Sequence, residues 1–324
     1  MIHRLKRTEL SDRLSCGTAT HINNKQQEEV MMVYLKSFRL TSDRTEIDFI
    51  QGEGRTCFGT FYPFKIFTRK ELSRVEFDDV TIFYGGNGSG KSTLINVIAE
   101  KLGAARYSEF NTSPFFERFV DFCYSDIVRM PEECVVLTSD DVFDYVLKAR
   151  TVNEAIDEKR NALIDEYVKT YNETMTNPEL GLLSGLDDYE RWARNREIMS
   201  KRRTQSKFVK KRVAPDIDLY SNGETAMRYF VDRISGNAVY LLDEPENSLS
   251  VELQAELAQF IEATARAARS QFIIATHSPI LLSMRGAKIY NLDSIPAEPC
   301  KWTELPNVRR YYDFFMEHSE EFEN

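Results

Sequence analysis

Apolar residues recur along the chain in two patterns, short runs and longer stretches of helical spacing. In the first third, four short runs predict strands at residues 33–40, 46–50, 64–67 and 80–84. Their apolar positions alternate or run continuously, as in half-buried and fully buried strands. Glycines between the runs indicate turns. This part of the chain is therefore expected to be rich in strands.

Helical spacing begins at about residue 92 and continues to 102. A strand is predicted at 133–139, and a charged helical region from 141 to about 213, broken near 177–178 and 181–185. The remaining predictions are strands at 238–244, 272–278 and 288–292, with helices at 251–268 and 307–317. Strands that alternate with helices predict an α/β fold with a mainly parallel sheet.

The composition is that of a soluble globular protein, with 42% apolar and 29% charged residues in 324. No apolar run approaches the roughly 18 to 20 residues of a membrane span. The five cysteines are scattered without a C-x-x-C pair, which indicates reduced thiols and a cytoplasmic protein.

The first 30 residues are polar and show little periodicity. They lack the apolar core of a signal peptide. Two interpretations stay open: translation starts at Met31 or Met32 and the leader is not native, or the leader is a true disordered tail.

A glycine-rich loop follows the strand at 80–84. Gly85-x-x-x-x-Gly90-Lys91-Ser92 fits the phosphate-binding loop, with a strand before it and a helix after it. Backbone N–H groups of such a loop surround phosphate oxygens, and the helix dipole adds to the attraction. Lys91 is expected to reach the β- and γ-phosphates, and the Ser92 hydroxyl to bind Mg²⁺. The predicted nucleotide-binding residues are Gly85, Gly86, Asn87, Gly88, Ser89, Gly90, Lys91, Ser92 and Thr93.

A second acidic motif ends the strand at 238–244. Its apolar run delivers Asp243 and Glu244 to the strand end, where neighbouring side chains are expected to point to opposite sides. Asp243 is predicted to hold Mg²⁺, and Glu244 to polarise the attacking water. His277, just past the next strand, is placed to hydrogen-bond a γ-phosphate. Ser221 and Gly223 begin another helix, which is a further anion-binding geometry.

In this order and spacing, the motifs resemble those of ABC-type ATPases, and most closely the soluble SMC-like and RecF-like branch of the broad group called AAA family ATPases. The resemblance covers residues 33–292. Residues 85–92 match Walker A, and 239–244 match Walker B with its catalytic glutamate. Ser221, Asn222, Gly223 and Glu224 resemble the family signature, residues 247–250 the D-loop, and His277 the switch histidine.

The resemblance implies an ATPase (EC 3.6 class) with ATP and Mg²⁺ as its cofactors, and Lys91, Glu244 and His277 as catalytic residues. It implies an ATP-dependent homodimer in which the signature acts in trans, coupled to an effector protein. One ATPase domain is then expected, with a leader at 1–30, N-terminal strands and a Walker A lobe at 31–140, an inserted helical subdomain at 141–220, and the signature, Walker B and switch histidine at 221–324. The alternative is an ATP-binding subunit coupled to a membrane transporter.

This chain departs from the family pattern at several positions. Tyr220, Asn222 and Glu224 replace signature residues, and Ser250 stands where the D-loop aspartate is expected. Asp140 occupies the place of the Q-loop glutamine and is a further candidate ligand of Mg²⁺. The adenine-stacking aromatic is left open among Phe61, Tyr62, Phe64 and Phe67.

A basic strip at residues 191–212 contrasts with the net charge of −9 for the whole chain. It carries ten Lys or Arg and one Glu, on a pattern compatible with a helix that buries one face. Two interpretations stay open: a solvated helix paired with acidic neighbours such as 153–166, or a surface for nucleic acid or an acidic partner.

Overall fold

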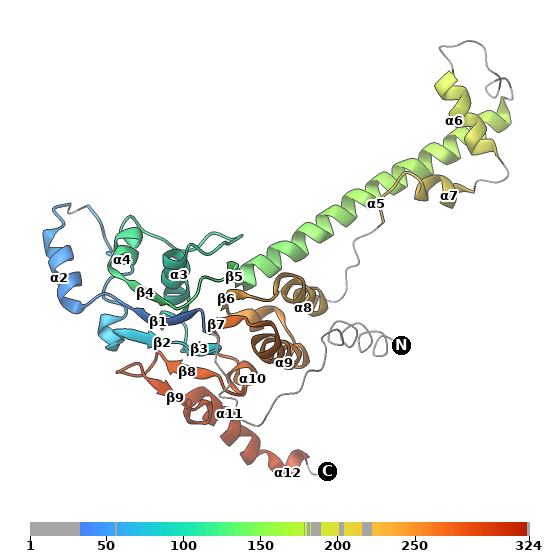
Figure 1. Cartoon of the computed structure of the whole chain (residues 1–324). Coiled ribbons are helices and arrows are strands. Elements are labelled where there is room, and N and C mark those ends of the chain that lie inside the picture. The colour runs from blue at the N-terminus through green and yellow to red at the C-terminus, as the bar shows by residue number, and fades with distance from the viewer. Residues whose placement is uncertain are drawn as a thin grey trace, which may run out of the picture. The chain divides into compact units, whose positions relative to one another are not determined.

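A six-stranded sheet with the order β5-β6-β7-β3-β8-β9 lies at the centre of the computed structural model (Figure 1). Its strands are β3 (Val80–Tyr84), β5 (Glu133–Thr138), β6 (Ala238–Asp243), β7 (Gln271–Ala275), β8 (Lys288–Asn291) and β9 (Pro299–Cys300). Neighbouring strands are parallel except for the antiparallel pair β8 and β9. The predicted mainly parallel sheet is confirmed.

The structure describes residues 33–55, 57–177, 179, 182, 189–200, 204–215 and 222–322. The predicted leader at 1–30 lies outside the described residues, as do Tyr220 and Ser221 of the predicted signature. From Val33 onward the chain forms one compact unit.

A second sheet of three antiparallel strands has the order β2-β1-β4. Its members are β1 (Leu35–Arg39), β2 (Arg74–Glu76) and β4 (Tyr124–Ile127). Gln271 at the start of β7 ties it to the main sheet, because its side-chain amide accepts from Leu35 N and donates to Leu35 O at 2.9 Å each. N-terminal antiparallel strands are thus present as predicted, but only β1 lies within a range predicted as a strand, and β2 and β4 were not predicted.

Two of the predicted strands are wrong. Residues 46–50 lie inside helix α2 (Asp43–Gly52), where the Ser42 hydroxyl caps the first turn by accepting from Thr45 N. Glu46, Phe49 and Ile50 have the spacing of one helical face, which the strand prediction overlooked. Residues 64–67 form turns before the short helix η2 (Thr68–Lys70), and Lys65 has φ +65°.

Alternate residues of the strands pack into two separate cores. On β6, Val239 and Leu241 join a core with α3 (Lys91–Leu102), α4 (Phe116–Phe122) and the antiparallel sheet. Tyr240 and Leu242 point the other way, into a core with α8 (Asn222–Arg233) and α9 (Val251–Ala268). Because both faces are covered, the strand is apolar throughout, as in other parallel sheets.

Helix α5 (Ser139–Thr176) begins directly after β5, two residues before the predicted start. A capping box fixes this junction: the Thr138 hydroxyl accepts from Asp141 N, and the Asp141 carboxylate accepts from Thr138 N at 2.8 Å. The helices α6 (Tyr189–Met199) and α7 (Gln205–Lys210) pack on the second half of α5. The predicted helical region between Walker A and the signature is therefore present.

The chain continues after β6 through η5 (Pro245–Ser248), and after β7 through α10 (Pro279–Leu282). It ends with η6 (Trp302–Glu304), α11 (Pro306–Glu317) and α12 (Ser319–Phe322). The predicted helices at 251–268 and 307–317 correspond to α9 and α11. Among the described helices, none combines the length and the apolar character needed to cross a bilayer.

Candidate active site

The phosphate loop lies where β3 ends and α3 begins. Gly88 and Gly90 adopt φ of +77° and +96°, a conformation that L-residues rarely adopt. A Cβ on Gly85 would lie 2.4 Å from the Ser89 hydroxyl oxygen, so only glycine fits there. No side chain caps the N-terminus of α3. Its first-turn N–H groups therefore remain suited to an anion.

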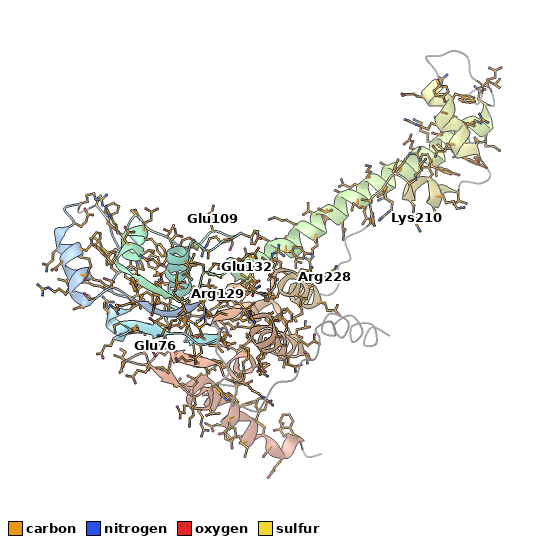
Figure 2. The ribbon with its side chains drawn as sticks, viewed as in Figure 1. Glu76, Glu109, Arg129, Glu132, Lys210 and Arg228 are labelled. Carbon is orange, nitrogen blue, oxygen red and sulfur yellow. The ribbon has the colours of Figure 1, made fainter. Side chains whose placement is uncertain are left out.

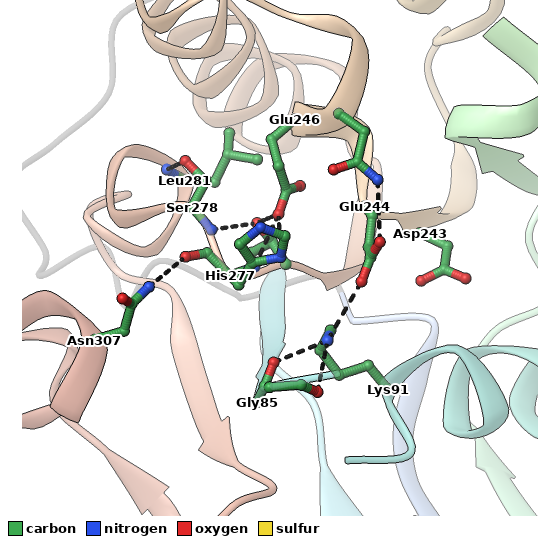
Figure 3. Close-up of polar contacts among 12 residues, drawn as sticks. Gly85, Lys91, Asp243, Glu244, Glu246, His277, Ser278, Leu281 and Asn307 are labelled. Atoms are coloured by element: carbon green, nitrogen blue, oxygen red, sulfur yellow. Dashed lines mark hydrogen bonds and ion pairs between the residues drawn. The ribbon is translucent and has the colours of Figure 1, made fainter. Parts of the chain in front are cut away.

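Lys91 is buried, and its ammonium faces the other half of the site (Figure 3). Its Nζ donates to the carbonyl oxygens of Gly85 at 2.8 Å and Gly86 at 3.2 Å, and pairs with Glu244 Oε1 at 3.3 Å. The residue predicted to bind phosphate and the residue predicted to activate water are thus in direct contact.

Ser92 and Asp243 provide two oxygen donors at one point. The Ser92 hydroxyl donates to Asp243 Oδ1 at 3.1 Å. Burial raises the pKa of Asp243 to about 6, and the nearby Glu244 charge adds to this, against the Ser92 hydrogen bond. Hydroxyl and carboxylate oxygens are the ligands that Mg²⁺ prefers, and Mg²⁺ usually takes its other ligands from phosphates and water. The pair therefore fits the predicted metal role.

Glu244 does not continue the strand, contrary to the expectation that the two carboxylates point to opposite sides. It adopts a left-handed conformation with φ +48°, which turns its side chain to the same edge as Asp243. Its Oε2 accepts from Asn247 Nδ2 at 3.0 Å. The expectation failed because alternation of side chains holds only while the backbone stays extended.

His277 is oriented by a buried carboxylate. Glu246 Oε1 accepts from the Thr276 hydroxyl at 2.6 Å and from His277 N at 2.8 Å, and it lies 3.3 Å from His277 Nδ1. The imidazole itself is half-exposed. On its other side, Asn307 Nδ2 on α11 donates to His277 O at 3.3 Å. Such contacts fix the ring while leaving Nε2 available to a ligand.

A cleft of about 450 Å³ opens beside Ser92 and Asp243. Its lining includes Asp140, at the start of α5, as well as Glu244 and Asn247. Asp140 thus lies beside the predicted metal ligands, although among the residues that the structure describes no cluster of three or more His, Cys, Asp or Glu could hold a metal ion.

The aromatic residues that are candidates for stacking on adenine differ in how deeply they are buried. Phe64 and Phe67 are buried in the core, whereas Tyr62 lines the cleft and its hydroxyl donates to Thr93 Oγ1 at 3.1 Å. Tyr62 is therefore the candidate that the cleft favours.

Only part of the predicted signature can be located. Of its described residues, Gly223 lies at the start of α8, and a Cβ there would meet Leu253 Cδ1 at 2.7 Å. Gly223 also approaches the backbone of Ser248 and Ser250, in the predicted D-loop. Gly223 of the predicted signature is thus adjacent to the predicted D-loop of the same chain.

Comparison with known proteins identifies the family. A model described as "AAA domain, putative AbiEii toxin, Type IV TA system" matches residues 117–283, just over half of the chain. The chain belongs to this AAA-domain family. The match spans Asp140, His277 and the residues predicted as signature and Walker B. The predicted membership of the broad AAA family ATPases is confirmed.

Relatives of the AAA-domain protein are distant. An uncharacterized ABC transporter ATP-binding protein/permease of Saccharomyces cerevisiae is 26% identical over 255 residues, 74% of this chain. The chain spans only 18% of that relative's length. Two of the similar solved structures differ widely from this chain in sequence. The SMC head domain from Thermotoga maritima is 14% identical with a TM-score of 0.33, covering 83% of this chain and 99% of that one. A putative metal-chelate type ABC transporter, in an inward-facing conformation, is 12% identical with a TM-score of 0.36, covering 88% and 90%.

Sequence reasoning missed Arg106 in this AAA-domain protein. Arg106 lines the cleft, donates to Asn96 Oδ1 at 2.8 Å, and lies 3.9 Å from the centre of the Phe110 ring. Burial lowers the pKa of its guanidinium. It is a second cation, besides Lys91, close to the predicted phosphate site, and no motif in the sequence marks it.

Proposed function

We propose that the chain binds ATP with Mg²⁺ and hydrolyses it. The supporting observation is that Lys91, Ser92, Asp243 and Glu244 converge within 3.3 Å, from motifs about 150 residues apart. Lys91 and the first turn of α3 hold the phosphates, and Ser92 with Asp243 holds Mg²⁺, which neutralises phosphate charge. Glu244 accepts the proton of the attacking water.

The contact between Lys91 and Glu244 supplies a means of control. A γ-phosphate competes with the Glu244 carboxylate for the Lys91 ammonium, because both are anions seeking the same cation. Once Lys91 turns to phosphate, Glu244 is released to act on water. Asn247 then keeps the carboxylate in place through its hydrogen bond to Oε2.

The proposed working unit is an ATP-dependent homodimer coupled to a separate effector. Two copies face each other so that each ATP lies between one Walker A and the other copy's signature, residues 221–224. ATP then stabilises the closed dimer, and hydrolysis removes the γ-phosphate contacts that held it. The adjacency of Gly223 to the predicted D-loop supports this, because both segments would face the partner together.

An ATP-driven switch with a separate effector could serve DNA repair or defence against phage, and the family description favours defence. It names a putative toxin of a type IV toxin–antitoxin system, and a toxic activity must be held under control. The second candidate function is an ATP-binding subunit coupled to a membrane transporter, which the yeast relative's name favours.

The first test separates phosphate capture from water activation. Lys91→Ala should lose tight ATP binding, whereas Glu244→Gln should bind ATP but turn over at least about 100-fold more slowly, as expected for removal of a general base. ATP binding and phosphate release measure the two steps. Glu256→Gln, an exposed glutamate on α9, is the matched control and should behave like the parent. Normal turnover in Glu244→Gln would overturn the Walker B assignment.

A further inference from the structure

The helices α6 and α7 form a small module with the second half of α5. Its core consists of three buried residues packed against partly buried neighbours on α5: Ile198, Phe208 and Val209 against Leu163, Ile164 and Tyr167. This cluster is separate from the two cores of the ATPase domain. The inner faces of α6 and α7 therefore pack in this core, and their outer faces take no part in it.

Part of the basic strip is neutralised within this module. Arg194 pairs with Glu166 on α5 at 3.0 Å, and Arg212 pairs with Glu197 on α6 at 2.6 Å. Arg212 also stacks on the Phe208 ring, 3.8 Å from its centre. These two arginines hold the helices together, so the interpretation as a paired, solvated helix is right for them.

That interpretation does not account for α7. Lys207, Lys210 and Lys211 stand at i, i+3 and i+4, on the side of the helix opposite Phe208 and Val209. All three lysines are exposed, and none forms an ion pair with any residue in the described part of the chain. Figure 2 labels Lys210 among the side chains of this module. The result is an uncompensated row of three positive charges.

The outer face of α6 adds aromatic rings. Tyr189 is 55% exposed, and its ring lies 5.8 Å from that of Trp192, one helical turn on. The Arg196 guanidinium lies 5.1 Å from the centre of the Trp192 ring. Tyr189, Trp192 and Arg196 share the face opposite the buried Ile198. Tyr189 is exposed and Trp192 is partly buried. Rings that reach the surface beside a cation offer a stacking surface for unpaired bases.

We propose that the outer surface of α6 and α7 binds single-stranded nucleic acid. Lys207, Lys210 and Lys211 contact the phosphates, and Tyr189 with Trp192 stacks on bases. A duplex would use the lysines but not the rings, because its bases are already stacked on each other. An acidic protein would likewise have no need of these two rings. The inference is independent of ATP hydrolysis, since it concerns residues outside the ATP site.

The test uses the full chain and labelled 20-nucleotide probes: oligo(dT), oligo(U), and a duplex of mixed sequence. Fluorescence anisotropy over about 50–300 mM salt should show tighter binding of a single strand than of the duplex, with affinity falling steeply as salt rises. Reversing Lys207, Lys210 and Lys211 to Glu should abolish most binding. Trp192→Ala should weaken single-strand binding about 5- to 150-fold, the effect of losing one stacked base.

The matched control reverses three exposed cations elsewhere: Lys36, Arg39 and Arg285 to Glu. It changes the net charge equally and should bind like the parent. Thermal melting of each variant checks that the module still folds. The proposal is overturned if the parent binds neither single strand at 100 mM salt, or if poly-glutamate competes as well as oligo(dT) does. Equal losses in the two triple variants, or a Trp192→Ala variant that binds like the parent, would also overturn it.

Discussion

At the residue scale, Asp243 is a carboxyl group whose ionised form is disfavoured in the folded protein. Burial raises the pKa from its ordinary value of 3.8 to about 6, so the folded state binds a proton more readily than the unfolded state. The raised pKa of Asp243 stabilises the folded protein fully below about pH 4, and this stabilisation is lost as the pH rises through about 6. A bound Mg²⁺ reverses the preference, because the cation favours the ionised form.

We therefore expect Asp243→Asn to be more stable than the parent at pH 7.5, by about 1 to 3 kcal/mol, since the amide keeps the acceptor for Ser92 without the buried charge. The gain should shrink towards zero at pH 4. Chemical denaturation of both proteins at several pH values measures it. Stabilisation by Mg²⁺ with ATP should be present in the parent and much reduced in the variant. A gain that does not change with pH would contradict the account.

At the element scale, the junction of β5 and α5 connects the inserted helices to the cleft. Thr138 closes the capping box, and its hydroxyl also lies 3.1 Å from that of Ser108. Ser139 and Asp140, the next residues, line the same cleft as Ser92 and Asp243. A movement of α5 would therefore shift residues that lie beside the predicted metal site.

Removing this cap should destabilise the protein locally. Thr138→Ala is expected to lower the free energy of unfolding by about 1 kcal/mol, the usual cost of losing an N-cap. It should also lower ATP turnover, because Asp140 is no longer held at the cleft. Thr176→Ala is the control at the other end of α5, where the exposed hydroxyl donates only to Asn172 O. Equal effects of the two substitutions on turnover would count against a role for the junction.

At the scale of the whole molecule, the proposed sites are completed by a second copy. Walker A, Walker B and His277 belong to one body, whereas residues 221–224 are proposed to act on the ATP of the partner. This proposal predicts that the monomer does not turn over ATP and that activity per molecule rises with protein concentration.

Mixing two inactive variants tests the composite sites. Lys91→Ala and Ser221→Arg should each be nearly inactive alone, since one lacks phosphate binding and the other the signature. Mixed in equal amounts, they should recover up to about a quarter of parent turnover, because half the dimers are mixed and each has one intact site. Lys91→Ala mixed with Glu244→Gln is the control and should recover nothing, because both lesions lie on the Walker side. Failure of the first mixture, with dimers present by sedimentation, would contradict the model.

From the sequence alone one could predict the glycine loop between β3 and α3, the strand that ends at Asp243, and the main strands and helices after residue 238, although not β9, α10 or α12. Each of these features depends only on a short stretch of sequence. The loop is a run of glycines between a strand and a helix, and each strand or helix has apolar residues at the spacing of one type of secondary structure. The strand predictions at 46–50 and 64–67 were wrong because a short apolar run is compatible with the spacing of a strand or of a helix. In the first of these segments, the cap formed by Ser42 favours a helix.

Which side chains of the site meet depends on the tertiary structure. The left-handed backbone at Glu244 turns it towards Lys91, and Glu246 reaches His277 from the following turn. Arg106 lines the cleft. Arg194 and Arg212 pair with the nearby glutamates, and Lys207, Lys210 and Lys211 form no ion pair with any residue that the structure describes. None of this follows from spacing along the chain, because strands β3, β6 and β7 bring together residues that are far apart in sequence, and their neighbours in space fix the charge balance.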